Sequence, residues 1–266
     1  MGSTAMESRI IKYIHLLLFL FIPLIWLALL SILKLPITIW LLAVGEIIIS
    51  SYFLFVRPRL FIPSLFFALL LLSVYLPLPQ KLWMVNILII ILFMAILMLA
   101  IKPLRKLIPG IPQGNINFKI IAFMIFTVII SSTALFIWVN ATNPDLSFFI
   151  ETAKPFKGIL IIGAIIGFPI FNSLAEELIF RWFLWDGFET LTLKPALIIV
   201  IQAIIFGLSH YNGFPNGWSG IGLAAIYGLM LGYIRHSSKG LAAPIITHIF
   251  ADLTIIIIVF RTAGMI

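Results

Sequence analysis

The sequence predicts an all-α fold, a polytopic transmembrane helical bundle with about 8 to 9 spans, on three observations. Of its 266 residues, 63% are hydrophobic and only 10% are charged, whereas soluble domains average about 45–50% and 25%. Uncharged apolar stretches of roughly the 20 residues that a spanning helix needs recur along the whole chain. No stretch alternates polar and apolar residues over about ten positions, which argues against a membrane β-barrel.

Basic or proline-containing breaks divide the chain into its candidate spans. We expect these spans at residues 10–33, 36–56, 60–78, 83–101, 118–139, 158–189, 195–210, 220–235 and 241–260. The segments 102–117 and 140–157 are expected to be loops, because they combine prolines with polar and charged residues. The sixth span is expected to kink at Pro169, since proline removes a helical hydrogen bond.

The distribution of charge predicts how the chain sits in the membrane. Its 17 Lys and Arg outnumber its 9 Asp and Glu, and most basic residues lie between apolar runs, as membrane anchors do. This pattern predicts no nucleic-acid partner, because nucleic-acid binding needs a basic face in water. The bias of basic residues at span ends predicts a multi-pass protein of the cell membrane with a cytoplasmic N-terminus. The absence of cysteine excludes disulfides, thiolate metal ligands and cysteine nucleophiles.

Ionisable residues inside the predicted spans are the strongest functional signal. Such groups are costly in a bilayer and are candidates for a functional site by default. Most of them fall in the last third of the chain, on three successive spans. The six residues are Glu46, Glu176, Glu177, His210, His248 and Asp252. Glu46 stands apart from any motif, so a packing role is predicted for it.

The spacing of these residues places them on helix faces. Glu177 and Arg181 lie one turn apart and can pair, which leaves Glu176 free. His248 and Asp252 are also four residues apart, so they share a face. The helical rise of about 1.5 Å per residue places the three polar faces in the cytoplasmic half to the midplane of the membrane. We therefore expect a site that opens to the cytoplasm.

Three motifs, in this order, resemble those of the CPBP (Abi) family, which includes the type II CAAX prenyl endopeptidases: E-E-x-x-x-R at 176–181, F-x-x-x-H at 206–210 and H-x-x-x-[N/D] at 248–252. The resemblance implies an intramembrane endopeptidase that hydrolyses a peptide bond near the membrane surface, with prenylated CAAX-type tails among its candidate substrates. It divides the chain into a leader or cytoplasmic segment (1–9), N-terminal transmembrane helices (10–157) and a CPBP-like catalytic core (158–266). Its expected partners are membrane lipid and a peptide or prenylated protein.

The resemblance also implies roles for the motif residues. Glu176 would activate water with help from His210. Glu177 and Arg181 would shape and charge-balance the site. His248 and residue 252 would stabilise the oxyanion or bind a metal. The implied catalytic set is Glu176, Glu177, Arg181, His210, His248 and Asp252.

Position 252 departs from the commoner form of the third motif, because it is Asp rather than Asn. An ionised carboxylate cannot donate a hydrogen bond to an oxyanion. Asp252 must therefore be protonated, orient His248 or ligate a metal. Two histidines with carboxylates suit zinc, and the candidate ligands are Glu176, His210, His248 and Asp252. Apart from this Zn²⁺ alternative, no cofactor is expected.

Two other readings of the sequence stay open. Gly217-Trp218-Ser219-Gly220 matches the G-x-S-G of rhomboid serine proteases, with His248 as the base. That reading leaves Glu176, Glu177 and His210 unexplained. A proton-coupled transporter or a non-catalytic membrane scaffold would also place Glu and His within spans. Inverted repeats would favour a transporter, and none is visible by eye.

Overall fold

The computed structural model describes residues 10–20, 24, 36–73, 83–107 and 110–266. The predicted leader at 1–9 lies outside the described residues, as do most of the second half of the first predicted span and the end of the third. Within the described ranges every regular element is a helix. The predicted all-α class is therefore confirmed for this part of the chain.

The helices follow one another with short connections. An apolar helix over Ile10–Leu20 comes first. It is followed by α2 (Pro36–Val56), α3 (Pro58–Leu72), α4 (Trp83–Ala100), α5 (Lys102–Arg105), α6 (Phe118–Thr142), α7 (Ser147–Ala153), α8 (Ile159–Glu177), the π-helical segment η4 (Leu178–Leu184), α9 (Trp185–Thr190), α10 (Pro195–Ser209), α11 (Gly217–Ser238) and α12 (Ala242–Thr262).

Two short helices correct the prediction of loops at 102–117 and 140–157. In α5, Pro103 occupies the first turn, where its missing N–H costs nothing and its fixed φ favours a helix. Before α7, Asp145 accepts a hydrogen bond from the backbone N–H of Ser147, and the hydrogen bonds from Ser147 lower the pKa of Asp145. Proline and polar residues started helices here, whereas we had taken them to exclude helices.

Four helical stretches are long and apolar enough to cross a membrane: α6, the continuous run Ile159–Thr190, α11 and α12. Shorter apolar helices accompany them, including α3 and α10, so the predicted count of 8 to 9 spans is not confirmed. Of the apolar window of α12, 61% is buried, against 17% for α6. The protein is an integral membrane protein in which α12 is a central helix and α6 a peripheral one.

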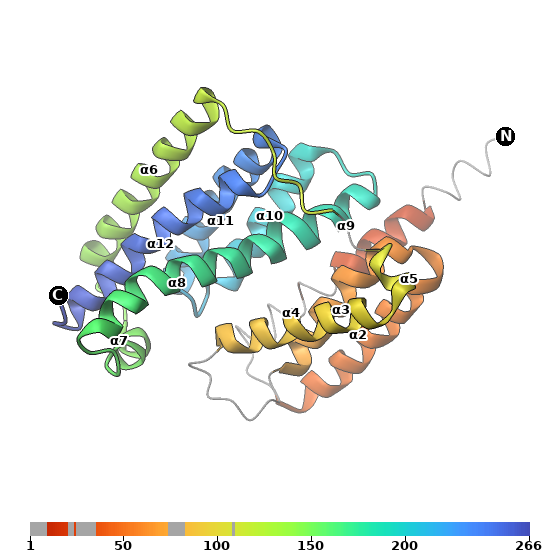
Figure 1. The fold of residues 1–266 in the computed structure, drawn as a ribbon, viewed down its shortest axis with the longest axis horizontal. Coiled ribbons are helices and arrows are strands. Elements are labelled where there is room, and N and C mark those ends of the chain that lie inside the picture. The colour runs from red at the N-terminus through yellow and green to blue at the C-terminus, as the bar shows by residue number, and fades with distance from the viewer. Residues whose placement is uncertain (1–9, 21–23, 25–35, 74–82, 108–109) are drawn as a thin grey trace.

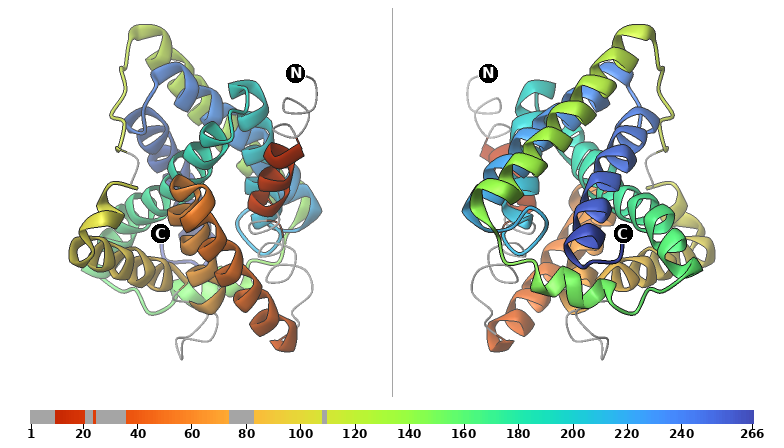
Figure 2. Two further views of the ribbon diagram at one scale, coloured as in Figure 1. Left: turned by 90° about the vertical axis from the view of Figure 1, so that its right-hand side faces the viewer. Right: turned by 90° about the vertical axis from the view of Figure 1, so that its left-hand side faces the viewer.

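The helices form two groups (Figures 1 and 2). In the C-terminal group α12 packs against α8, α6 and α11, and α10 lies along α11. In the N-terminal group α2 packs along α3, and α3 contacts α4. The groups meet where Phe66 of α3 lies against Phe183 of η4, with ring centroids 5.0 Å apart. The N-terminal helices thus support η4, which directly follows the first motif.

The close approach of α10 to α11 depends on a glycine. A Cβ atom added at Gly207 would lie 2.7 Å from the carbonyl oxygen of Ile221 and 2.8 Å from the Cβ of Ala225. Gly207→Ala is therefore expected to lower the free energy of unfolding by about 1–3 kcal/mol. Gly222→Ala on the same helix pair is the control, because its Cβ would meet nothing within 4 Å. Thermal unfolding in detergent would contradict this if both variants melted alike.

Candidate active site

The first motif lies on the longest helical run of the structure. Pro169 is inside α8 but does not end it, and the run continues through η4 into α9. Glu177 ends α8, and Arg181 lies within the π-helical segment η4. Arg235 of α11 donates a hydrogen bond from Nε to the carbonyl oxygen of Arg181 at 3.1 Å. Wide helical turns of this kind occur often at functional sites.

Glu177 is the centre of the polar cluster. Its Oε1 accepts hydrogen bonds from Nη1 of Arg181 at 2.9 Å and from Nδ1 of His248 at 2.7 Å. The side chains of Glu177 and Arg181 are both 0% exposed. The guanidinium also lies over the ring of Phe206, 4.7 Å from its centroid, and donates to the carbonyl of Gly228. The predicted pairing of Glu177 with Arg181 is confirmed, and it joins three helices.

The second nitrogen of His248 faces two further carboxylates. Its Nε2 lies 3.5 Å from Oε2 of Glu176 and 3.5 Å from Oδ1 of Asp252. Since Nδ1 donates to Glu177, Nε2 is the nitrogen that remains for a ligand. Oε2 of Glu176 has no hydrogen-bond partner in the described part of the chain, and this side chain is 12% exposed. Glu176 therefore has an uncommitted oxygen beside an imidazole.

Asp252 is held by two residues that the sequence analysis missed. Its Oδ2 accepts hydrogen bonds from Nδ2 of Asn172 at 2.9 Å and from Oγ of Ser173 at 3.1 Å. These residues lie one turn before Glu176 and Glu177, so the same i to i+4 spacing would have placed them on this face. The two hydrogen bonds fix Asp252 as an acceptor.

His210 reaches the edge of the cluster through Phe206. Its Nδ1 lies 2.8 Å from the carbonyl oxygen of Phe206, and the two rings are 4.5 Å apart. The ring of Phe206 is also 6.1 Å from that of His248. With Nδ1 donating to its own helix, Nε2 of His210 is the nitrogen left for water or substrate.

Tyr227 on α11 is a third residue that the sequence analysis missed. Its ring lies 5.4 Å from that of His248, at an interplanar angle of 81°. Its hydroxyl oxygen is buried and has no hydrogen-bond partner among the described residues. No spacing links Tyr227 to a motif, but the presence of a phenol inside an apolar span was a usable signal.

The side chains present do not fit a zinc ion. Zinc needs three protein donors at about 2.0–2.2 Å, and no group of three His, Asp or Glu in the described ranges is placed to hold a metal. Nδ1 of His248 and Oδ2 of Asp252 are both engaged in hydrogen bonds to protein groups. Ligation by Glu176, His210, His248 and Asp252 stays a prediction, and the mechanism below uses no metal.

Ser219 lies far from the cluster along the membrane normal. It is 19 residues from the end of α11, about 28 Å, whereas His248 is six residues into α12 from the same end, about 9 Å. Its Oγ accepts a hydrogen bond from Nε1 of Trp138. The contacts of His248 are instead with Glu177, Glu176 and Asp252. This arrangement argues against a serine nucleophile at Ser219.

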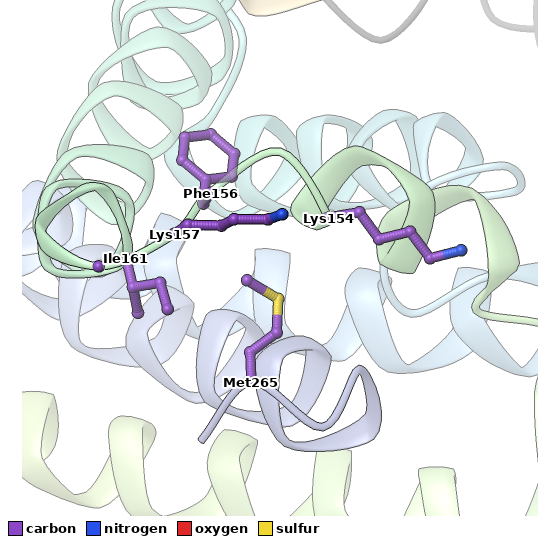
Figure 3. A pocket seen from close by; sticks show the side chains of 6 residues that line it. Lys154, Phe156, Lys157, Ile161 and Met265 are labelled. Carbon is purple, nitrogen blue, oxygen red and sulfur yellow. The ribbon is translucent and has the colours of Figure 1, made fainter.

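The other predicted residue and two cavities lie outside the cluster. Glu46 on α2 is buried, with one carboxylate oxygen lacking a partner in the described part. A cavity of about 290 Å³ lies between the connection of α7 to α8 and the C-terminal residues, where Met265 faces Lys157 and Ile161 (Figure 3). A second, of about 390 Å³, is lined by Arg59, Lys106 and residues of η4, α9 and α11. None of the six motif residues lines either cavity.

Comparison with known proteins confirms the resemblance over one part of the chain. Residues 157–254 match the family described as type II CAAX prenyl endopeptidase Rce1-like, a segment that holds all three motifs. An uncharacterized protein of Bacillus subtilis (strain 168), YyaK, is 31% identical over 125 residues. That match covers 45% of this chain and 40% of the relative. No solved structure matches the chain.

Proposed function

We propose that this protein, whose residues 157–254 are similar to the type II CAAX prenyl endopeptidases, is an endopeptidase of the membrane. It hydrolyses a peptide bond near the membrane surface with water activated by Glu176. The observation that carries the proposal is the pairing of a free Glu176 oxygen with Nε2 of His248 at 3.5 Å. A general base needs such an uncommitted oxygen within reach of a bound water.

The proposed reaction uses Glu176 as a proton carrier. A water held between Glu176 and His210 loses a proton to the Glu176 carboxylate while its oxygen attacks the scissile carbonyl. The carbonyl electron pair moves onto the oxygen to give a tetrahedral oxyanion. Collapse of this intermediate breaks the C–N bond, and protonated Glu176 passes its proton to the leaving amine. Glu176 returns to its starting state.

Glu177 and Arg181 act on the reaction through His248. The Glu177 carboxylate accepts from Nδ1 of His248, which fixes the tautomer and the direction of Nε2. Arg181 balances the charge of Glu177 in a site from which water is excluded. The three side chains thus hold an imidazole nitrogen at the reacting centre.

The substrate that we propose is the C-terminal tail of a prenylated protein. The family description supports a prenylated CAAX-type peptide, and a membrane-embedded site suits a substrate that carries a lipid. The positive-inside distribution of Lys and Arg supports a site that opens to the cytoplasm in the cell membrane.

The test is cleavage of a quenched fluorescent prenylated CAAX peptide by the full-length protein in lipid vesicles. We expect cleavage by the wild type, by Ser219→Ala and in the presence of a chelator, because neither a serine nor a metal enters the mechanism. Activity lost in Ser219→Ala would favour the rhomboid reading, and activity lost with chelator would restore the zinc alternative. A wild type that cleaves neither prenylated nor unprenylated peptides would favour the scaffold or transporter.

A further inference from the structure

We propose that Tyr227 is a further catalytic residue, whose hydroxyl donates a hydrogen bond to the oxyanion of the tetrahedral intermediate. The inference rests on the proposed endopeptidase function. It assigns to α11 a part of the chemistry, whereas the three motifs lie on the run from α8 to η4, on α10 with the residue after it, and on α12.

The need for another donor arises from how Asp252 is held. Its Oδ2 accepts from both Asn172 and Ser173, and its Oδ1 faces Nε2 of His248. A carboxylate that accepts hydrogen bonds on both oxygens has no proton to donate to an oxyanion. The residue at position 252 therefore leaves vacant the donor role that an amide there would fill.

The other cationic donors of the cluster are already engaged. Arg181 donates Nη1 to Glu177 and Nη2 to the carbonyl of Gly228. His248 donates Nδ1 to Glu177, and its Nε2 faces two carboxylate oxygens. A donor for newly formed negative charge must come from a group without such commitments.

Tyr227 is such a group. Its hydroxyl is buried without a partner in the described ranges, and its ring packs edge-on to His248 at 5.4 Å. The hydroxyl also lies within electrostatic reach of Glu176, Glu177, Arg181 and Asp252. A preorganised O–H in a water-poor site stabilises charge that develops in the transition state far more than the same group does in water.

The hydrogen bond fits the balance of the reaction. When the water oxygen bonds to the carbonyl carbon, the carbonyl electron pair moves onto oxygen, where the Tyr227 O–H meets it. Tyr227 keeps its proton throughout, because Glu176 accepts the proton of water and returns it to the amine. Tyr227 is thus a donor only, and the stoichiometry is that of simple hydrolysis.

The test compares Tyr227→Phe with Tyr233→Phe, which removes the same hydroxyl from an exposed tyrosine of the same helix. We expect Tyr227→Phe to lower kcat by about 10²–10³-fold with KM unchanged, the size of effect seen for one oxyanion donor. Its affinity for a phosphinate peptide that mimics the tetrahedral state should fall by a similar factor. Tyr233→Phe should match the wild type in every measurement.

Each other outcome overturns the inference in a recognisable way. Wild-type kcat in Tyr227→Phe would leave the endopeptidase standing and remove Tyr227 from its chemistry. A rise in KM together with a lower melting temperature, at constant affinity ratio between phosphinate and substrate, would show a structural role. A wild type that cleaves no peptide would overturn the proposed function itself, and the role of Tyr227 with it.

Discussion

Glu176→Gln is expected to lower kcat for peptide cleavage by about 10²–10⁴-fold, the usual contribution of a general base. Glutamine keeps the size and one oxygen of the side chain but cannot take a proton from water. Oε2 of Glu176 has no hydrogen-bond partner within the described chain, so the substitution breaks no hydrogen bond of that oxygen. We therefore expect the melting temperature to stay close to that of the wild type, which separates a chemical loss from a folding defect.

Glu46→Gln is the matched control for this prediction. Glu46 is also a buried carboxylate within an apolar helix, and one of its oxygens likewise lacks a partner among the described residues. It takes part in none of the contacts of the cluster, so peptide cleavage should be unchanged. Steady-state cleavage rates in vesicles decide the matter. Equal activity in Glu176→Gln and wild type, or equal loss in both variants, would contradict a general base at position 176.

The sequence predicted helix positions well wherever proline or charge marks a boundary. The span expected at 36–56 is α2, with the same limits, because Pro36 begins the apolar run and Arg57 follows it. Likewise the predicted segment at 195–210 differs from α10 by one residue, since proline suits the first turn of a helix. Local rules sufficed for these elements because their limits depend on neighbouring residues.

Contacts between helices were beyond the same rules. The four-residue spacing predicted the pairing of Glu177 with Arg181, but spacing within one helix cannot show that His248 of α12 shares the same carboxylate oxygen. Nor can it show that Asn172 and Ser173 turn toward Asp252. These facts depend on how α8 and α12 pack, which the periodicity of each helix leaves undetermined.

The N-terminal half carries no motif, yet the structure gives it a role in supporting the site. Phe19 contacts Phe188 of α9 with centroids 5.3 Å apart, and Phe66 contacts Phe183 of η4. These aromatic contacts lie directly after Arg181 in the chain. The first 157 residues therefore form the surface against which the helix of the Glu pair is packed.

Arg181→Met is expected to lower the free energy of unfolding by about 3–5 kcal/mol, because it leaves Glu177 as a buried charge without its main counterion. Both side chains are 0% exposed, so water cannot take the place of the guanidinium. Lys154→Met is the control, since it removes a cation from an exposed i, i+3 pair with Glu151. Exposed pairs contribute about 0–1 kcal/mol. Reversible unfolding in mixed micelles measures both variants on one scale.

The double variant Glu177→Gln/Arg181→Met separates stability from catalysis. Removing both charges avoids the isolated carboxylate, so stability should recover part of the loss. Activity should not recover, because Nδ1 of His248 then faces a neutral amide and its tautomer and direction are no longer fixed by a carboxylate. If Arg181→Met unfolds like the wild type, the charge of Glu177 is balanced by His248 alone. If the double variant regains full activity, Glu177 does not act through His248.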